Sequence, residues 1–143
     1  MPARDATIPE SALPTPVAVP GWPQPRGYSD VVHATGRVVA LAGQVGWNPV
    51  TREFDTDDFA AQCGQCLRNI TTALRAAGAE PKHLVRLTWY ITRRDAYLAS
   101  RERLGELYRE IVGRHFPAMS VVLVSGLLEP RALVEIEATA VVP

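Results

Sequence analysis

The sequence predicts an α+β fold in which two helices cover one face of a single β-sheet, in the order β-β-α-β-α-β-β. Two long stretches have apolar residues at three- and four-residue intervals, as amphipathic helices do. Several shorter stretches are rich in β-branched residues and are bounded by turn residues, as strands are. The length of 143 residues suits one domain, and 47% hydrophobic with 21% charged residues is an ordinary globular composition.

The N-terminal part of the chain, Met1 to Gly27, is rich in proline and is predicted to be an extended arm. A single folded domain is then expected over residues 28–143. Its first two strands are predicted at Ser29–Ala34 and Arg37–Ala42. The Thr35-Gly36 turn between them favours a hairpin.

A loop from Gly43 leads into a helix that is predicted to begin near Thr56. Three aspartates crowd its start, where the helix dipole favours negative charge, and Thr56 can cap it. Gly78 is a typical residue for ending such a helix. Gly64 in its middle costs about 1 kcal/mol relative to alanine, which close packing against the sheet would explain. The predicted apolar face consists of Phe59, Cys63, Cys66, Leu67, Ile70, Leu74 and Ala77.

The second half of the chain alternates between strand and helix. A strand is predicted at about Leu84–Thr92, with Leu87, Trp89 and Ile91 facing one way. A helix follows at about Asp95–Val112, and Gly113 with Pro117 ends it. The last two strands are expected at about Met119–Ser125 and Ala132–Val142.

The apolar run from Val121 to Val124 predicts a strand that is buried on both faces. The two predicted helices cover only one face of the sheet. Because the chain supplies no third layer, another subunit is expected to cover the second face.

Cys63 and Cys66 form a C-x-x-C pair, which is compatible with a redox pair, a metal site or ordinary packing. A redox pair begins a helix, whereas Cys63 lies about two turns inside this one. A metal site needs further ligands, and His33, His83 and His115 are scattered along the chain. The prediction is therefore buried packing for both cysteines, with no metal and no cofactor.

Lysine plus arginine equals aspartate plus glutamate at 15 each, so the formal net charge is zero. Proteins that bind nucleic acid usually have a basic excess, so nucleic acid is not an expected partner. No apolar segment reaches the roughly 18–20 residues of a membrane span, and the N-terminus lacks a signal-peptide pattern. The expectation is a cytoplasmic protein without a membrane partner.

Six segments occur in the order seen in one family: "RGYSDVV", "ALAGQVGWNP", "LRNITTALRAAGA", "HLVRLTWYIT", "FPAMS" and "ALVEIEATAVV". From Tyr28 to Pro143 the chain resembles the Rid family, the reactive intermediate deaminases or YjgF proteins. The resemblance implies a chorismate-mutase-like α+β fold that assembles as a homotrimer around a central barrel, with small-molecule clefts between subunits. Active members hydrolyse enamines and imines to a keto acid and ammonia without a metal or cofactor.

The resemblance also assigns site residues. Tyr28 matches the aromatic residue at the cleft entrance, and Gly43 matches the glycine whose N–H contacts the ligand. Gln44 and Trp47 belong to the same loop, although alanine precedes Gly43 where active members usually have serine. Glu135 matches the glutamate that positions the attacking water. Without the resemblance, Glu135 would be interpreted as a solvent-facing strand carboxylate or a subunit contact.

Met119, in "PAMS", stands where active members read "PARS", so a thioether replaces the arginine that grips the substrate carboxylate. Val121 stands where many members have cysteine. Losing one charged, desolvated ligand contact commonly costs about 2–5 kcal/mol, so the usual 2-aminoacrylate activity is expected to be weak or absent. Arg131, Arg37 and Arg86 are candidates to replace the clamp, with surface ion pairing as the alternative for each.

Two functions remain open at this point. The first is a divergent hydrolase in which Glu135 directs water onto an imine, an enamine or a related electrophile. The second is a non-catalytic trimeric module that binds a metabolite or a partner in the same clefts. The apolar residues around a single glutamate favour a less acidic and more apolar ligand.

Overall fold

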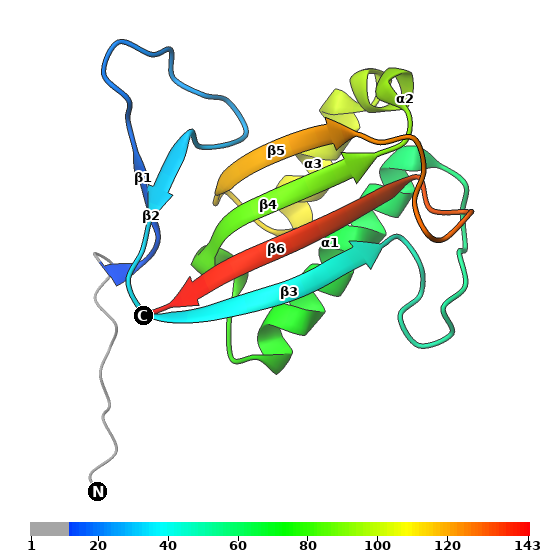
Figure 1. The fold of residues 1–143 in the computed structure, drawn as a ribbon, viewed down its shortest axis with the longest axis horizontal. Coiled ribbons are helices and arrows are strands. Elements are labelled where there is room, and N and C mark those ends of the chain that lie inside the picture. The colour runs from blue at the N-terminus through cyan, green and yellow to red at the C-terminus, as the bar shows by residue number, and fades with distance from the viewer. Residues whose placement is uncertain (1–11) are drawn as a thin grey trace, which may run out of the picture.

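The computed structural model describes residues 12–143, so the first eleven residues of the predicted arm lie outside it. Four strands form one sheet in the order β3-β6-β4-β5, and the helices lie behind it in Figure 1, on one face only. The α+β prediction is therefore confirmed. The strands are β3 (Arg37–Val45), β4 (Leu84–Ile91), β5 (Ala118–Leu123) and β6 (Val134–Val142), and the helices are α1 (Phe59–Ala76), α2 (Arg94–Ala99) and α3 (Arg101–Ile111).

The pairing of the strands decides which side chains share a face. β6 is antiparallel to both β3 and β4, whereas β4 and β5 are parallel. Trp89 of β4 pairs with Val121 and Ile136, and these three side chains lie on the helix-covered face. Tyr90 pairs with Glu135, so those two side chains lie on the open face.

The predicted hairpin is wrong. β2 (Val31–His33) pairs with β1 (Thr15–Val17) as a separate two-stranded sheet, seen beside the main sheet in Figure 1. β3 instead pairs with β6, because two nine-residue strands form a longer ladder than a three-residue strand allows. Gly36 leads into this pairing at φ +149°, where an added Cβ would lie 2.1 Å from the carbonyl oxygen of Val142.

Helix α1 begins three residues later than predicted and is capped by another residue. The Asp58 carboxylate accepts a hydrogen bond from the N–H of Ala61 at 2.9 Å, so Asp58 is the N-cap. Thr56 instead accepts from the N–H of Asp58 at 3.0 Å. The expected helix end is confirmed, since Gly78 has φ +71°.

The predicted second helix is two helices. Ser100 ends α2 and begins α3 with ψ near zero, which turns the chain between them. The atoms nearest to an added Cβ at Gly64 belong to Arg68 and to Leu107 of α3, at 3.5 Å and beyond. The expected packing of Gly64 against the sheet is therefore wrong, because α1 turns this residue toward α3.

Strand β5 forms one edge of the sheet and is exposed in the single chain. Val121, Val122 and Leu123 are 41%, 42% and 56% exposed, so the predicted burial of this run on both faces does not occur within one chain.

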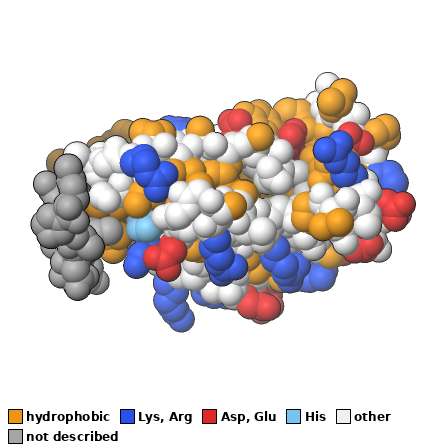
Figure 2. All heavy atoms as spheres, turned by 90° about the horizontal axis from the view of Figure 1, so that it is seen from below, with side chains coloured by type: hydrophobic (Ala, Val, Ile, Leu, Met, Phe, Trp, Pro, Cys, Tyr) orange, Lys and Arg blue, Asp and Glu red, His pale blue; other side chains and the backbone are white. Residues whose placement is uncertain are grey.

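The helices described from Ala12 onward include none that is long and apolar enough to cross a membrane. Figure 2 shows Lys and Arg side chains interspersed with Asp and Glu on the face in view.

Candidate functional site

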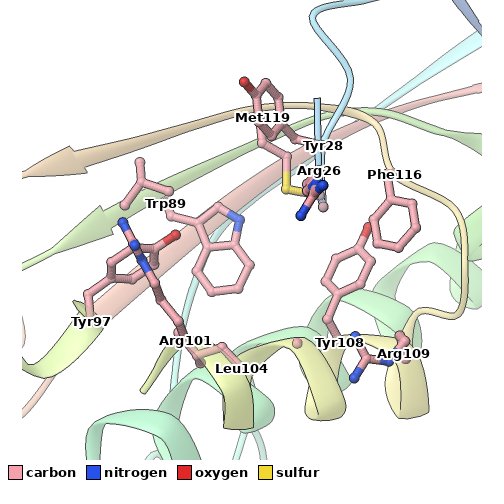
Figure 3. Close-up of a pocket in the computed structure, with 13 residues that line it drawn as sticks. Arg26, Tyr28, Trp89, Tyr97, Arg101, Leu104, Tyr108, Arg109, Phe116 and Met119 are labelled. Carbon is pink, nitrogen blue, oxygen red and sulfur yellow. The ribbon is translucent and has the colours of Figure 1, made fainter. Parts of the chain in front are cut away.

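A cavity of about 630 Å³ opens between α3 and the helix-covered side of β4 and β5 (Figure 3). The segment that contains Tyr28 closes one side of it. Met119 and Val121 of β5 also line it, so the structure brings three of the sequence-predicted site residues together.

Ser29 fixes the segment that carries Tyr28. Its N–H donates to the carbonyl of Pro117 at 3.1 Å, and its hydroxyl donates to the carbonyl of Phe116 at 2.5 Å. A parallel bridge also joins Ser29 to Ala118, the first residue of β5. A segment that precedes the main sheet in the chain is thereby held next to the start of β5.

Glu135 and Gly43 form a second group. β3 has a register irregularity between Leu41 and Gln44, and Gly43 lies inside it. A Cβ atom at Gly43 would lie 2.5 Å from Oε1 of Glu135, so the carboxylate occupies the space that a side chain at position 43 would fill. The side chain of Gln44 is turned back and donates to the carbonyl of Ala42 at 3.1 Å.

These two groups lie on opposite faces of the sheet. Glu135 projects from the open face, whereas Met119 and Val121 project from the helix-covered face of β5. β4 also separates β6 from β5. A single chain therefore does not place Glu135 beside Met119.

Trp47 belongs to neither group. Its ring packs against Phe54 with 5.9 Å between centroids, and the guanidinium of Arg52 lies 5.9 Å from the same ring. Its carbonyl accepts a hydrogen bond from Asn69 at 3.1 Å, which ties the loop to α1.

The three arginines proposed from the sequence as replacements for the clamp lie outside the cavity. Arg131 is ion-paired with Asp57 at 2.8 Å, as the surface interpretation predicts. Arg37 donates to the carbonyl of Ala77 at 3.1 Å, and Arg86 lies exposed on β4.

Three other arginines line the cavity, and the sequence analysis missed them: Arg26, Arg101 and Arg109. A signal for two of them was present in the sequence. Arg101, Gly105 and Arg109 recur at four-residue intervals, which places them on one face of a helix. Arg26 carries no such signal, because only the tertiary contact of Ser29 brings its segment to the cavity.

The indole nitrogen of Trp89 is also directed into this region without a partner. Trp89 is 5% exposed, and its Nε1–H is the one buried side-chain polar group in residues 12–143 that has no hydrogen-bond partner. A buried donor without an acceptor costs about 1–3 kcal/mol. Trp89 lines the cavity, and its nitrogen is buried behind the cavity wall, so a bound acceptor atom can remove that cost if a neighbouring side chain moves aside.

Two polar features are explained by the fold alone. The Tyr90 hydroxyl donates to Glu137 at 2.8 Å on the open face, and this bond raises the pKa of the phenol.

Cys63 and Cys66 are fully buried, so the packing prediction is confirmed. Burial raises the pKa of both thiols. Within residues 12–143, no group of three or more His, Cys, Asp or Glu side chains is placed to hold a metal ion.

Comparisons with known proteins extend over most of the chain. A family profile described as Endoribonuclease L-PSP matches residues 23–142. Protein DfrA of Myxococcus xanthus is 36% identical over 120 residues, which cover 80% of this chain and 84% of that protein. The human 2-iminobutanoate/2-iminopropanoate deaminase is 28% identical over 115 residues, which cover 80% of this chain and 79% of that one.

A solved structure from Yersinia pestis, the protein YyfB of the conserved Rid protein family, superposes with a TM-score of 0.71. Its sequence is 38% identical, and the match covers 81% of this chain and 87% of that one.

Proposed function

The chain belongs to the Rid (YjgF) family, whose profile bears the description Endoribonuclease L-PSP, and on that premise we propose that it is a divergent member that hydrolyses an imine or enamine. The proposed site is a cleft between subunits in which Glu135 directs the attacking water. The deaminase name of the human relative supports the reaction class.

The single observation that carries this proposal is the position of the Glu135 carboxylate against Gly43. The absence of a side chain at Gly43 lets Oε1 approach the backbone of β3, as an added Cβ there would lie only 2.5 Å away. A carboxylate within hydrogen-bond reach of a bound water can act as a general base, which commonly contributes about 10²–10⁴-fold to a rate.

The proposed reaction is the addition of water to a carbon–nitrogen double bond. Glu135 takes a proton from the water as its oxygen bonds to the imine carbon. The carboxyl group returns this proton to the nitrogen, which gives a carbinolamine. Glu135 then moves the hydroxyl proton to the nitrogen as the C–N bond breaks and the C=O bond forms, so the products are a carbonyl compound and ammonia. An enamine first takes a proton from water on its carbon and becomes the imine. No redox step is involved.

A homotrimer is part of the proposal, since Rid proteins are generally homotrimers. Two features of the chain support it. Glu135 and Met119 lie on opposite faces of the sheet, so Glu135 of a neighbouring subunit would have to complete the cleft. Strand β5 is also apolar and exposed in the single chain, with Leu123 56% exposed.

Met119 removes the usual carboxylate clamp from β5. A thioether cannot form the paired, charge-assisted hydrogen bonds of a guanidinium. We therefore expect low activity on 2-aminoacrylate, whose carboxylate lies next to the reacting carbon.

The test is a deaminase assay of the wild type, Met119→Arg and Glu135→Gln, with enamines and imines generated in situ from serine and from larger amino acids. Met119→Arg should raise kcat/KM for 2-aminoacrylate about tenfold or more, because it restores a charged contact. Glu135→Gln should lower kcat about a hundredfold on every substrate that the parent protein uses.

The second candidate function is a non-catalytic binding module. The specific observation in its favour is that Met119 and Val121 give β5 no functional group in the cavity. If neither the wild type nor Met119→Arg turns over any substrate, hydrolysis is wrong and the binding module is the better description. A Glu135→Gln variant with unchanged kcat would contradict the role given to that residue.

A further inference from the structure

Among residues 12–143, the charged side chains that line the cavity are all basic. They are Arg26, Arg101 and Arg109, and none of the described aspartates or glutamates lines it. None of these three guanidinium groups is ion-paired with another described residue, although neighbours such as Arg93 and Arg103 are. In a chain of zero net charge, three unpaired cations around one cavity favour an anionic ligand.

Helix α3 presents two of these cations on its cavity side. Arg101, Gly105 and Arg109 follow each other at four-residue intervals and all line the cavity. The guanidinium of Arg109 lies across the glycine, because an added Cβ at Gly105 would be 3.2 Å from Nη1 of Arg109. Guanidinium groups match the planar geometry of a carboxylate with two parallel hydrogen bonds.

The Trp89 indole supplies an independent observation. It is 95% buried, and its Nε1–H has no acceptor within the described chain. In Figure 3 the nitrogen is turned toward the part of the cavity where Met119 and Arg26 lie. Because the nitrogen itself is buried, a ligand oxygen can reach it only when a neighbouring side chain moves aside. An acceptor atom on the ligand would then satisfy the donor.

The remaining walls are apolar and aromatic. Leu104, Met119 and Val121 line the cavity, and the rings of Tyr108 and Phe116 stack with their centroids 5.5 Å apart. A volume of about 630 Å³ lies within the usual range for medium-sized organic ligands, and it is far larger than acetate or a phosphate ion needs.

We propose that this cavity binds an organic carboxylate with an apolar body of about one ring and a carbonyl-type oxygen. The guanidinium groups of Arg101 and Arg109 lie at opposite ends of the cavity in Figure 3, so both side chains turn inward to hold the carboxylate, and the Nε1–H of Trp89 donates to the carbonyl oxygen. As a statement about the substrate class, this inference rests on the proposed function. The carboxylate is held by α3 and not by β5, so the substrate is longer and its carboxylate lies farther from the reacting carbon.

Isothermal titration calorimetry with 3-benzoylpropanoate, which combines a carboxylate, a ketone and a phenyl ring, is the first test. The neutral 3-benzoylpropanamide should bind about tenfold more weakly, and 4-phenylbutanoate, which lacks the ketone, about fivefold more weakly. Acetate and inorganic phosphate should bind more weakly still. Equal affinity for the acid and its amide, or phosphate as tight as the acid, would overturn the proposal.

Variants of α3 locate the anion. Arg101→Gln and Arg109→Gln should each weaken 3-benzoylpropanoate about tenfold and leave the amide nearly unchanged. Arg103→Gln is the matched control, since Arg103 lies on the same helix but is ion-paired with Asp58 at 2.7 Å and does not line the cavity. An equal loss in Arg103→Gln would show a diffuse charge effect and contradict the proposed contacts.

The indole N–H resonances give a second measurement that does not depend on the arginine variants. The chain has 3 tryptophans, and Trp89→Phe assigns the signal of Trp89. Adding 3-benzoylpropanoate should shift the Trp89 signal with the same dissociation constant as calorimetry gives. The indole signals of Trp22 and Trp47 should not shift. An unmoved Trp89 signal at saturation would exclude the indole contact.

The outcomes separate this inference from the proposed function. Specific binding without turnover of any imine would leave the cavity assignment intact and refute hydrolysis. Turnover that is unaffected in the Arg101→Gln, Arg109→Gln double variant would support hydrolysis and refute the α3 clamp.

Discussion

At the scale of single residues, the proposed change of ligand depends on charged and uncharged side chains around one cavity. Met119 of β5 is uncharged, whereas Arg101 and Arg109 border the same cavity from α3. Trp89 adds a buried donor without a partner. A change of ligand is therefore a simpler interpretation than loss of the site, because unpaired buried polar groups are costly unless something binds them.

The two cysteines give a prediction at this scale. Burial raises the pKa of Cys63 and Cys66, so the reactive thiolate form is scarcer at pH 8 than in a free thiol. We expect iodoacetamide to label both cysteines about a hundredfold more slowly in the native protein than in guanidinium chloride, as followed by mass spectrometry. Fast labelling of the native protein would contradict the packing role.

At the scale of elements, strand register places the candidate residues. The parallel pairing of Trp89 with Val121 directs Val121, and Met119 two residues before it, toward α3. The irregularity in β3 between Leu41 and Gln44 brings Gly43 under Glu135. A shift of one residue in either strand would move these side chains to the other face.

Helix α1 supports a stability prediction. A Cβ at Gly64 would lie 3.5 Å from Leu107, an ordinary contact, so Gly64→Ala should gain the helix propensity of alanine. We expect about 1 kcal/mol more unfolding free energy and a Tm higher by about 3 °C, as measured by urea and thermal denaturation.

Gly46→Ala is the contrasting control. A Cβ there would lie 2.6 Å from the carbonyl oxygen of Gln62, which is helix backbone and cannot move aside cheaply. This variant should lose stability. A destabilised Gly64→Ala protein would show that the contact with α3 is tighter than the distances indicate.

At the scale of the whole molecule, the fold has one covered and one open sheet face. The open face and the β5 edge present apolar side chains such as Val38, Val122 and Leu123, which are 67%, 42% and 56% exposed. Exposed apolar surface on this scale is typical of a subunit interface. The proposed trimer would cover it and also bring the two halves of the cleft together.

Size-exclusion chromatography with light scattering tests the assembly. The wild type should have three times the 15.6 kDa mass of the chain, and Val122→Asp should shift it toward the monomer, because a carboxylate on β5 would be buried unpaired. Val50→Asp is the matched control, since Val50 is 89% exposed in a loop away from the sheet. A monomeric wild type at micromolar concentration would refute the trimer.

Much of the fold could be predicted from the sequence because its elements carry local signals. The α1 stripe from Phe59 to Leu74, the Gly78 stop and the alternation of Leu87, Trp89 and Ile91 are periodic patterns, and burial confirms them. The hairpin at Thr35-Gly36 and the unbroken second helix were wrong. Strand partners depend on residues far apart in the chain, and the turn at Ser100 has no strong breaker.

For the candidate site, the identities of the residues could be read from the amino-acid sequence: a methionine at position 119, a glutamate at 135 and a glycine at 43. The chemistry of a side chain is a local property, so it does not depend on folding. Which of these residues lie close together depends on tertiary contacts. Strand order separates Glu135 from Met119, and the contact of Ser29 with Pro117 brings Arg26 to the cavity, since long-range pairing leaves no periodic trace in a sequence.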